Sequence, residues 1–175
     1  VAAPSQELVE LLQRAVGHVV KVLQTRADDS SGLIGSVTQD LLAIHAQACD
    51  AGVADPLKLA KWMVRFRFRD QDFFEADPVR YAGALGERGL AAYRKAVVQA
   101  GNADSFAARY AQQRLAVVDR DIGRIVELLG GDLTMGHQFQ AIAEAMIEID
   151  RADLALSWAT RGIEETAGWQ TDRLY

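Results

Sequence analysis

Hydrophobic side chains recur every three or four positions along most of the chain, which is the spacing of one face of an α-helix. The pattern is clearest over 137–167, where two such stretches flank the polar run Asp150-Arg151-Ala152-Asp153. This arrangement predicts an antiparallel helical hairpin. The apolar positions are Phe139, Ile142, Ala143, Met146 and Ile149 on the first helix and Leu154, Ala155, Trp158, Ala159, Gly162 and Ile163 on the second.

Turn-forming residues divide the rest of the chain into further helical segments. Asp55-Pro56 has the form of an N-cap followed by proline at the first helical position, and Gly52 is the expected end of the preceding helix. The stretch 69–77 has no period and predicts an irregular connection. Pro4 and Ser5 mark the start of the first predicted helix, over 5–26. The further predicted helices run from Leu33 to Cys49, from Pro56 to Phe66, briefly from Val79 to Ala82, from Leu90 to Ala100, and over 106–129 as two helices or one bent helix.

No segment alternates apolar and polar residues between hairpin turns, so no strand is predicted. The expected fold is all-α, with roughly nine helices in a single helical repeat domain over 1–175, arranged as an irregular α-solenoid. A faint internal similarity supports a repeat, since LKLAKWMVR at 57–65 resembles DLALSWATR at 153–161. Their separation is not a regular period, so the array is expected to be irregular. The spacing also predicts Trp62 and Trp158 as core anchors.

The hairpin over 137–167 resembles one unit of the tetratricopeptide family, whose repeat of ~34 residues places a large and then a small residue on the first helix and alanines on the second. The chain departs from that pattern in three places. The glycine usual in the turn is Asp150, the aromatic residue of the second helix stands at Trp158, and the closing proline is Ala167. The resemblance implies a helical repeat that binds proteins.

A second resemblance covers most of 38–175. LALSWATRGIEE followed by DRLY, and the earlier stretch DLLAIHAQACDAGVADPLKLAKWMVRF, are similar to the helical region of an uncharacterised bacterial protein family. In several of its members such helices follow a SWIM-type zinc finger. This resemblance implies helical repeats and no established activity. Because the chain begins without Met and ends where another helix is expected, we predict a fragment of a longer bacterial protein.

Composition narrows the classes of function. The 175 residues are 50% hydrophobic, which suffices for a continuous core, and the formal charge of −5 gives no general attraction to nucleic acid or anionic membranes. A single cysteine excludes an internal disulfide, and one cysteine with three histidines makes a structural zinc site a poor expectation. There is no apolar run of ~20 residues and no signal peptide, so we expect a cytoplasmic protein without a cofactor and without a membrane partner.

The first helix of the predicted hairpin supplies the main candidate binding surface. If this helix lines a concave face, as it does in tetratricopeptide proteins, five side chains project from it. Two of them form an acidic pair one turn apart, which suits a basic peptide of a partner protein. An ordinary solvated helix face is the alternative. The five are His137, Gln140, Glu144, Ile147 and Glu148.

Arginines alternate with phenylalanines over 65–69, a mixture that can hold single-stranded nucleic acid. On a helix Arg65 and Arg69 share a face, whereas Arg67 points elsewhere. Acidic residues follow over 70–77 and can pair with these arginines. The alternative function is therefore a nucleic-acid-associated accessory domain of a zinc-finger protein, with Arg65 and Arg69 on phosphates.

His45 and Cys49 lie four positions apart on one predicted helix face, as two metal ligands or a catalytic pair would. Their neighbours on that helix are apolar and no third ligand or orienting group is evident, so we predict that both residues pack in the core. The carboxylates over 70–77 lack the glycine and terminal glutamate of a calcium loop. No phosphate-binding loop or hydrolase motif occurs, and we predict that the chain is not an enzyme.

Overall fold

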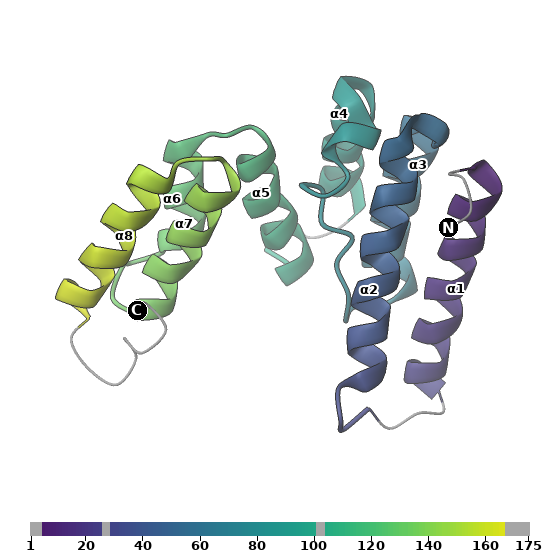
Figure 1. Cartoon of the computed structure of the whole chain (residues 1–175), viewed down its shortest axis with the longest axis horizontal. Coiled ribbons are helices and arrows are strands. Elements are labelled where there is room, and N and C mark those ends of the chain that lie inside the picture. Colours follow the sequence, from purple (N-terminus) through teal and green to yellow (C-terminus); the bar gives the residue numbers. More distant parts are fainter. Residues whose placement is uncertain (1–4, 26–28, 101–103, 167–175) are drawn as a thin grey trace. The chain divides into compact units, whose positions relative to one another are not determined.

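The computed structural model describes residues 5–25, 29–100 and 104–166. These residues form eight α-helices and two π-helical segments without any strand, which confirms the predicted all-α class (Figure 1). The contacts separate into two compact units, 1–108 and 109–175. The helices are α1 (Gln6–Thr25), α2 (Leu33–Ala48), α3 (Pro56–Arg65), α4 (Ala82–Ala100), α5 (Phe106–Val118), α6 (Ile122–Gly130), α7 (Gly136–Glu148) and α8 (Ala152–Glu165), and the π-helical segments are Cys49–Val53 and Phe66–Asp70.

Side chains cap the helices of the first unit at the positions where the chain leaves a turn. The Asp55 carboxylate accepts hydrogen bonds from the backbone N–H groups of Leu57 and Lys58, both at 2.9 Å, so the predicted N-cap is confirmed. Asp29 does the same for α2, with bonds of 2.9 and 2.8 Å from the N–H groups of Ile34 and Gly35. Ser5 caps α1, whereas Pro4 lies outside the described residues.

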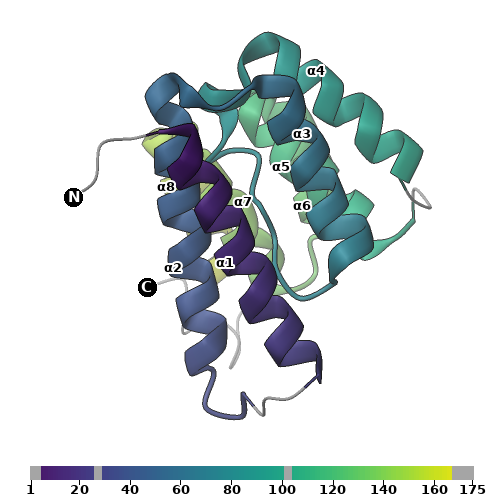
Figure 2. The ribbon, with the colours of Figure 1, turned by 90° about the vertical axis from the view of Figure 1, so that its right-hand side faces the viewer.

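The core of the first unit lies between α1, α2, α3 and α4 (Figure 2). Helices α1 and α2 run antiparallel and pack against each other. The buried residues of α1 recur every three or four positions, so they form one apolar face along its length. Trp62 of α3 is 8% exposed, which confirms it as a core anchor, and its ring stacks on Phe66 with centroids 5.3 Å apart. The other large buried side chains include Val9, Leu12, Val16, Val20, Leu42, Leu59, Met63, Tyr81, Leu85, Tyr93 and Val97.

The predicted short helix from Val79 to Ala82 is wrong, which is one reason why eight helices are described and not roughly nine. Backbone bonds from the N–H of Arg80 to Asp77 and from the N–H of Ala82 to Val79 span three residues each and form turns. Helix α4 then begins at Ala82 and bends at Gly86, whose φ of 52° is open to glycine. The expected break before the longer helix is present at this point, because the backbone of Gly86 leaves the helical conformation within α4.

The irregular connection is real, but it begins later than predicted because Phe66–Asp70 is π-helical. Gln71 holds the connection that follows. Its side-chain amide donates to the carbonyl oxygens of Phe66 at 3.1 Å and Phe74 at 2.8 Å. Its side-chain oxygen accepts from the N–H groups of Phe73 and Phe74, both at 2.7 Å. One buried glutamine thus satisfies the backbone where the helix ends.

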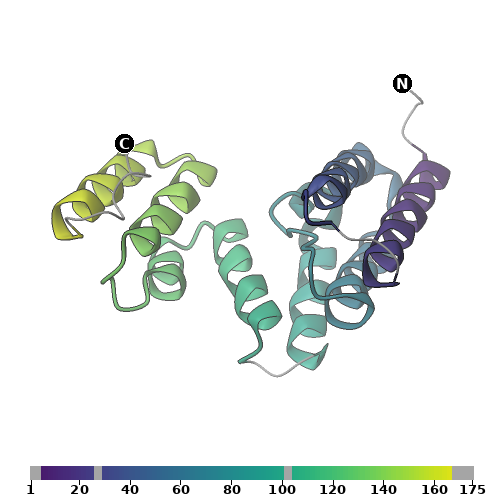
Figure 3. The same ribbon diagram turned by 90° about the horizontal axis from the view of Figure 1, so that it is seen from below.

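The second unit contains two helical hairpins, α5–α6 and α7–α8 (Figure 3). Their turns have the same backbone conformation at positions 30 residues apart, with a φ of 54° at Arg120 and of 61° at Asp150. The hydrogen bonds also correspond. Donor N–H groups and acceptor carbonyls pair as Asp119 with Leu115, Arg120 with Val117 and Asp121 with Ala116 in the first turn, and as Ile149 with Ala145, Asp150 with Ile147 and Arg151 with Met146 in the second.

The α7–α8 hairpin closes over the apolar positions that the sequence predicts. Phe139, Ile142 and Met146 are fully buried between the helices. Trp158 differs from the prediction because it is only half-buried, with its ring 6.2 Å from that of Phe139. The guanidinium of Arg161 covers the indole at 5.0 Å from its centroid. Among the described helices, none combines the length and apolar content that a membrane span requires.

The two tryptophans are expected to differ in their contribution to stability. Trp62→Ala should lower the free energy of unfolding by about 3–5 kcal/mol, the cost of emptying a buried aromatic site. Trp158→Ala should cost about 2 kcal/mol, because part of its ring is already in contact with solvent. Urea denaturation of both variants and the wild type provides the measurement. Equal losses at the two positions would contradict this assignment of burial.

Candidate functional site

A groove of about 320 Å³ lies between α3 and α4 in the first unit. Its α3 side continues into the π-helical segment and consists of Leu57, Ala60, Lys61, Val64, Arg65 and Arg69. Its α4 side consists of Ala92, Ala96, Gln99 and Ala100. The side chains that face each other across the groove are mostly short and aliphatic, so the two helices leave a space that they do not fill.

Three cationic residues, Lys61, Arg65 and Arg69, form one edge of this groove at intervals of four positions. The structure thus places Arg65 and Arg69 on one face, as their spacing predicts. Arg65 lies 3.3 Å from the carboxylate of Asp70, and both side chains are exposed. Lys61 and Arg69 have no carboxylate partner among the residues that the structure describes. None of the ten described lining residues is acidic.

Arg67 points away from the groove, as its position between the other two arginines predicts. Its guanidinium pairs with the carboxylate of Glu75, and the two side chains are only 10% and 22% exposed. Burial raises the pKa of Glu75, and the charge and hydrogen bond of Arg67 oppose that rise. Phe66 is buried and Phe68 half-buried, so the aromatic rings next to the arginines do not form an exposed stacking surface.

The five predicted binding residues of α7 do lie along one side of that helix. His137, Glu144, Ile147 and Glu148 are exposed and Gln140 is half-exposed. The amide of Gln140 donates to the carboxylate of Glu144 at 2.8 Å. The side chain of Ile147 is 63% exposed.

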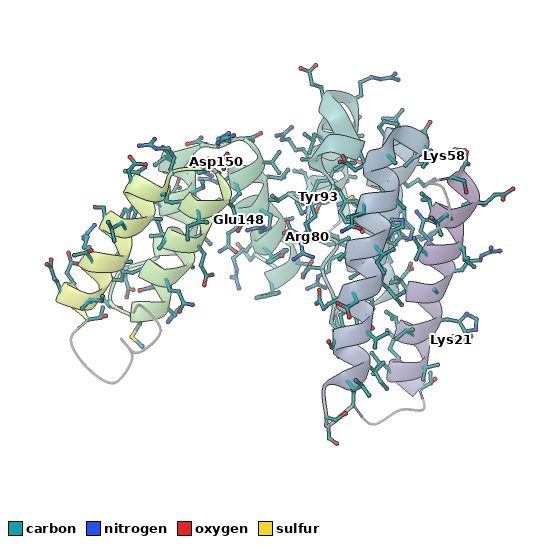
Figure 4. All side chains as sticks on the ribbon, in the orientation of Figure 1. Lys21, Lys58, Arg80, Tyr93, Glu148 and Asp150 are labelled. Atoms are coloured by element: carbon teal, nitrogen blue, oxygen red, sulfur yellow. The ribbon has the colours of Figure 1, made fainter. Side chains whose placement is uncertain are left out.

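Glu148 is not free for a basic ligand in the way that the sequence suggested. Both terminal nitrogens of Arg114, on α5, donate to its two carboxylate oxygens, one of them at 2.9 Å. Figure 4 places Glu148 at the end of α7, beside the turn that holds Asp150. Of the acidic pair Glu144 and Glu148, the charge of Glu148 is therefore already neutralised by Arg114. The sequence did not reveal this partner because Arg114 lies 34 positions away.

His45 and Cys49 are fully buried, which confirms their predicted packing in the core. Tyr81, which the sequence analysis did not single out, joins them. Its hydroxyl donates to the carbonyl oxygen of Leu42 at 3.1 Å and lies 2.9 Å from Nδ1 of His45. We therefore assign the imidazole proton to Nδ1, which leaves Nε2 as an acceptor 3.6 Å from the sulfur of Cys49. The ring of Trp62 covers the imidazole at 4.5 Å.

The protonation states of this cluster follow from its burial. Desolvation lowers the pKa of His45 to about 4, raises that of Cys49 to about 12 and raises that of Tyr81 further above its ordinary value. All three groups are neutral at pH 7. Within the described residues no group of three or more His, Cys, Asp or Glu side chains could hold a metal ion.

Comparison of the chain with models of protein families, with curated proteins and with solved structures gave no match. The resemblances to the tetratricopeptide repeat and to the family with the SWIM-type zinc finger therefore stay predictions.

The buried imidazole should make the protein less stable in mild acid. The pKa of His45 is lower in the folded chain than the ordinary value of 6.5, so the unfolded chain binds the extra proton between pH 6.5 and 4. Stability should fall by about 2 kcal/mol between pH 7 and 5 and level off below pH 4. The lowered carboxyl pKa values, at Asp55, Asp132 and Asp153, act at lower pH.

Urea titrations at several pH values measure how the free energy of unfolding changes with pH. The variant His45→Gln should lack this pH dependence, even if the substitution also changes its stability at pH 7. A His45→Gln protein with the pH dependence of the wild type would assign the effect to another group.

Cys49 should be chemically silent in the folded protein, because its thiol is buried and its pKa is raised to about 12. The chain has a single cysteine, so a chromogenic disulfide reagent reports on this thiol alone. We expect no labelling at pH 7.5 until denaturant unfolds the first unit, and then one equivalent. Rapid labelling of the native protein would show that the cluster opens readily.

Proposed function

We propose that this chain is a protein-interaction module built from helical repeats, which serves as a scaffolding segment of a larger bacterial protein. The observation that carries the proposal is the correspondence of the two hairpins in the second unit. Their turns repeat the same three backbone hydrogen bonds and the same left-handed residue after 30 positions. Repeated hairpins of this kind stack into a continuous surface, and such surfaces bind proteins.

Two arginines of the first hairpin support this arrangement by bonding to the second. Arg114 pairs with Glu148, and Arg120 donates to the carboxylate of Asp150 at 2.9 Å and to the carbonyl oxygen of Ile149. Both arginines therefore bond the α5–α6 hairpin to the α7–α8 hairpin in the absence of a ligand. A surface held in this way orders few additional groups when a partner binds, so less affinity is lost to entropy.

The exposed side of α7 is the surface that we assign to the partner. Ile147 supplies an apolar anchor, with His137, Glu144 and Glu148 around it as polar neighbours. An aliphatic centre with a polar rim is the usual anatomy of a transient interface. Glu144 is the carboxylate that remains for a basic side chain of the partner.

The test is a pull-down from bacterial lysate with the wild-type chain and with Ile147→Asp. A specific partner should be retained by the wild type and reduced about tenfold or more by Ile147→Asp, because a charge replaces the apolar anchor. Leu156→Asp, at a site on α8 that is 71% exposed, is the matched control and should retain the partner. Quantitative mass spectrometry reads the amounts, and circular dichroism checks the fold of both variants. Identical sets of proteins on both variants would remove α7 from this role.

A further inference from the structure

The α3–α4 groove combines an apolar lining with an unfilled volume. Ala60 and Val64, which are 1% and 8% exposed, form its floor, the half-buried Ala92 and Ala96 form its wall, and Leu57 at one end is 46% exposed. A volume of about 320 Å³ is within the range of ligand sites in proteins. The groove lies wholly within the first unit and shares no residue with the α7 surface.

The edge of the groove is positively charged, although the chain as a whole carries a net negative charge. The chain carries −5, yet Lys61, Arg65 and Arg69 follow one another along the groove and none of its described lining residues is acidic. From the first to the third cation the edge extends about 12 Å, at the rise of a helix. The contact of Arg65 with Asp70 joins two exposed side chains at 3.3 Å, so it contributes little and a ligand carboxylate can replace it.

The three cations and the apolar lining favour some classes of anionic ligand over others. A fatty acid has one carboxylate, so it cannot pair with all three cations along this edge, and with Arg65 on Asp70 it still leaves one of them without a partner. A nucleic acid would find phosphate partners, but no aromatic residue lines the described groove, so its bases gain no stacking. A helix with carboxylates at positions i, i+4 and i+8 spans the same ~12 Å and presents an apolar stripe beside them.

We propose that the groove between α3 and α4 binds an acidic amphipathic helix of a partner protein. Its carboxylates pair with Lys61, Arg65 and Arg69, while its apolar side chains lie against Val64, Ala92 and Ala96. The binding follows the helix-in-groove mode, in which the apolar contacts supply affinity and the charges set orientation.

The probe is a fluorescein-labelled synthetic helix with leucines on one stripe and glutamates at i, i+4 and i+8 beside it. Fluorescence anisotropy with the full 175-residue chain measures its affinity. The triple variant K61E/R65E/R69E should bind this helix at least about tenfold more weakly, because three charge pairs become repulsive. The same helix with lysines in place of the glutamates should prefer the triple variant over the wild type.

Two control variants distinguish binding in this groove from a general effect of the protein's net charge. The variant R14E/K21E/K95E makes the same change in net charge at exposed positions outside the groove lining and should bind like the wild type. Ala96→Trp keeps the cations but fills the groove, and it should abolish binding of the acidic helix. Circular dichroism confirms that each variant is folded.

Several results would overturn the proposal. Failure of the wild type to bind the acidic helix would do so, as would equal weakening by the two triple variants. Preferential binding of a single-stranded DNA oligonucleotide, with affinity falling steeply as salt rises, would assign the groove to nucleic acid. If dodecanoate displaces the labelled helix at a lower concentration than the unlabelled helix does, the groove is assigned to a lipid carboxylate. None of these results bears on the Ile147 experiment, so the two proposals fail separately.

Discussion

The first unit depends on a chain of buried hydrogen bonds that runs from Cys49 through His45 and Tyr81 to the carbonyl oxygen of Leu42. A buried polar group without a partner costs about 1–3 kcal/mol, so these groups can be buried together only in the one arrangement that pairs them. The arrangement places the turn before α4 against α2. Trp62 covers the imidazole and thereby positions α3 against the same cluster.

The candidate groove is a consequence of that packing. Ala60 and Val64 are each two positions from Trp62 and therefore about 200° around α3 from it. When Trp62 faces the buried cluster, these two side chains must face α4 on the other side of the helix. The cations at Lys61, Arg65 and Arg69 then follow the edge of the space between the two helices. The buried cluster thus positions a surface to which it contributes no atom.

In the second unit the governing constraint is the left-handed residue in each turn. Arg120 and Asp150 take φ values of 54° and 61°, which cost a residue with a side chain more than glycine. Asp is among the residues that tolerate this conformation, so Asp150 can occupy the turn without being glycine. Arg120 offsets its own strain by bonding to the neighbouring turn through Ile149 and Asp150.

The sequence by itself determined the local structure and the sharing of helix faces. Periodicity and capping placed the helices, Asp55 began α3, and the spacing of Arg65 and Arg69 put both on one face, because these features depend on residues within a few turns of one another. It also anticipated the burial of His45 and Cys49 from their apolar surroundings.

Only the tertiary structure decided which distant side chains meet. Tyr81 lies 36 positions from His45 and Arg114 lies 34 positions from Glu148, and no local period encodes either pairing. The half-burial of Trp158 likewise depends on what packs over it, since periodicity gives the direction of a side chain and not the extent of its cover. The contact with Arg114 pairs the charge of Glu148, because charge pairing is set by neighbours in space and not by spacing along one helix.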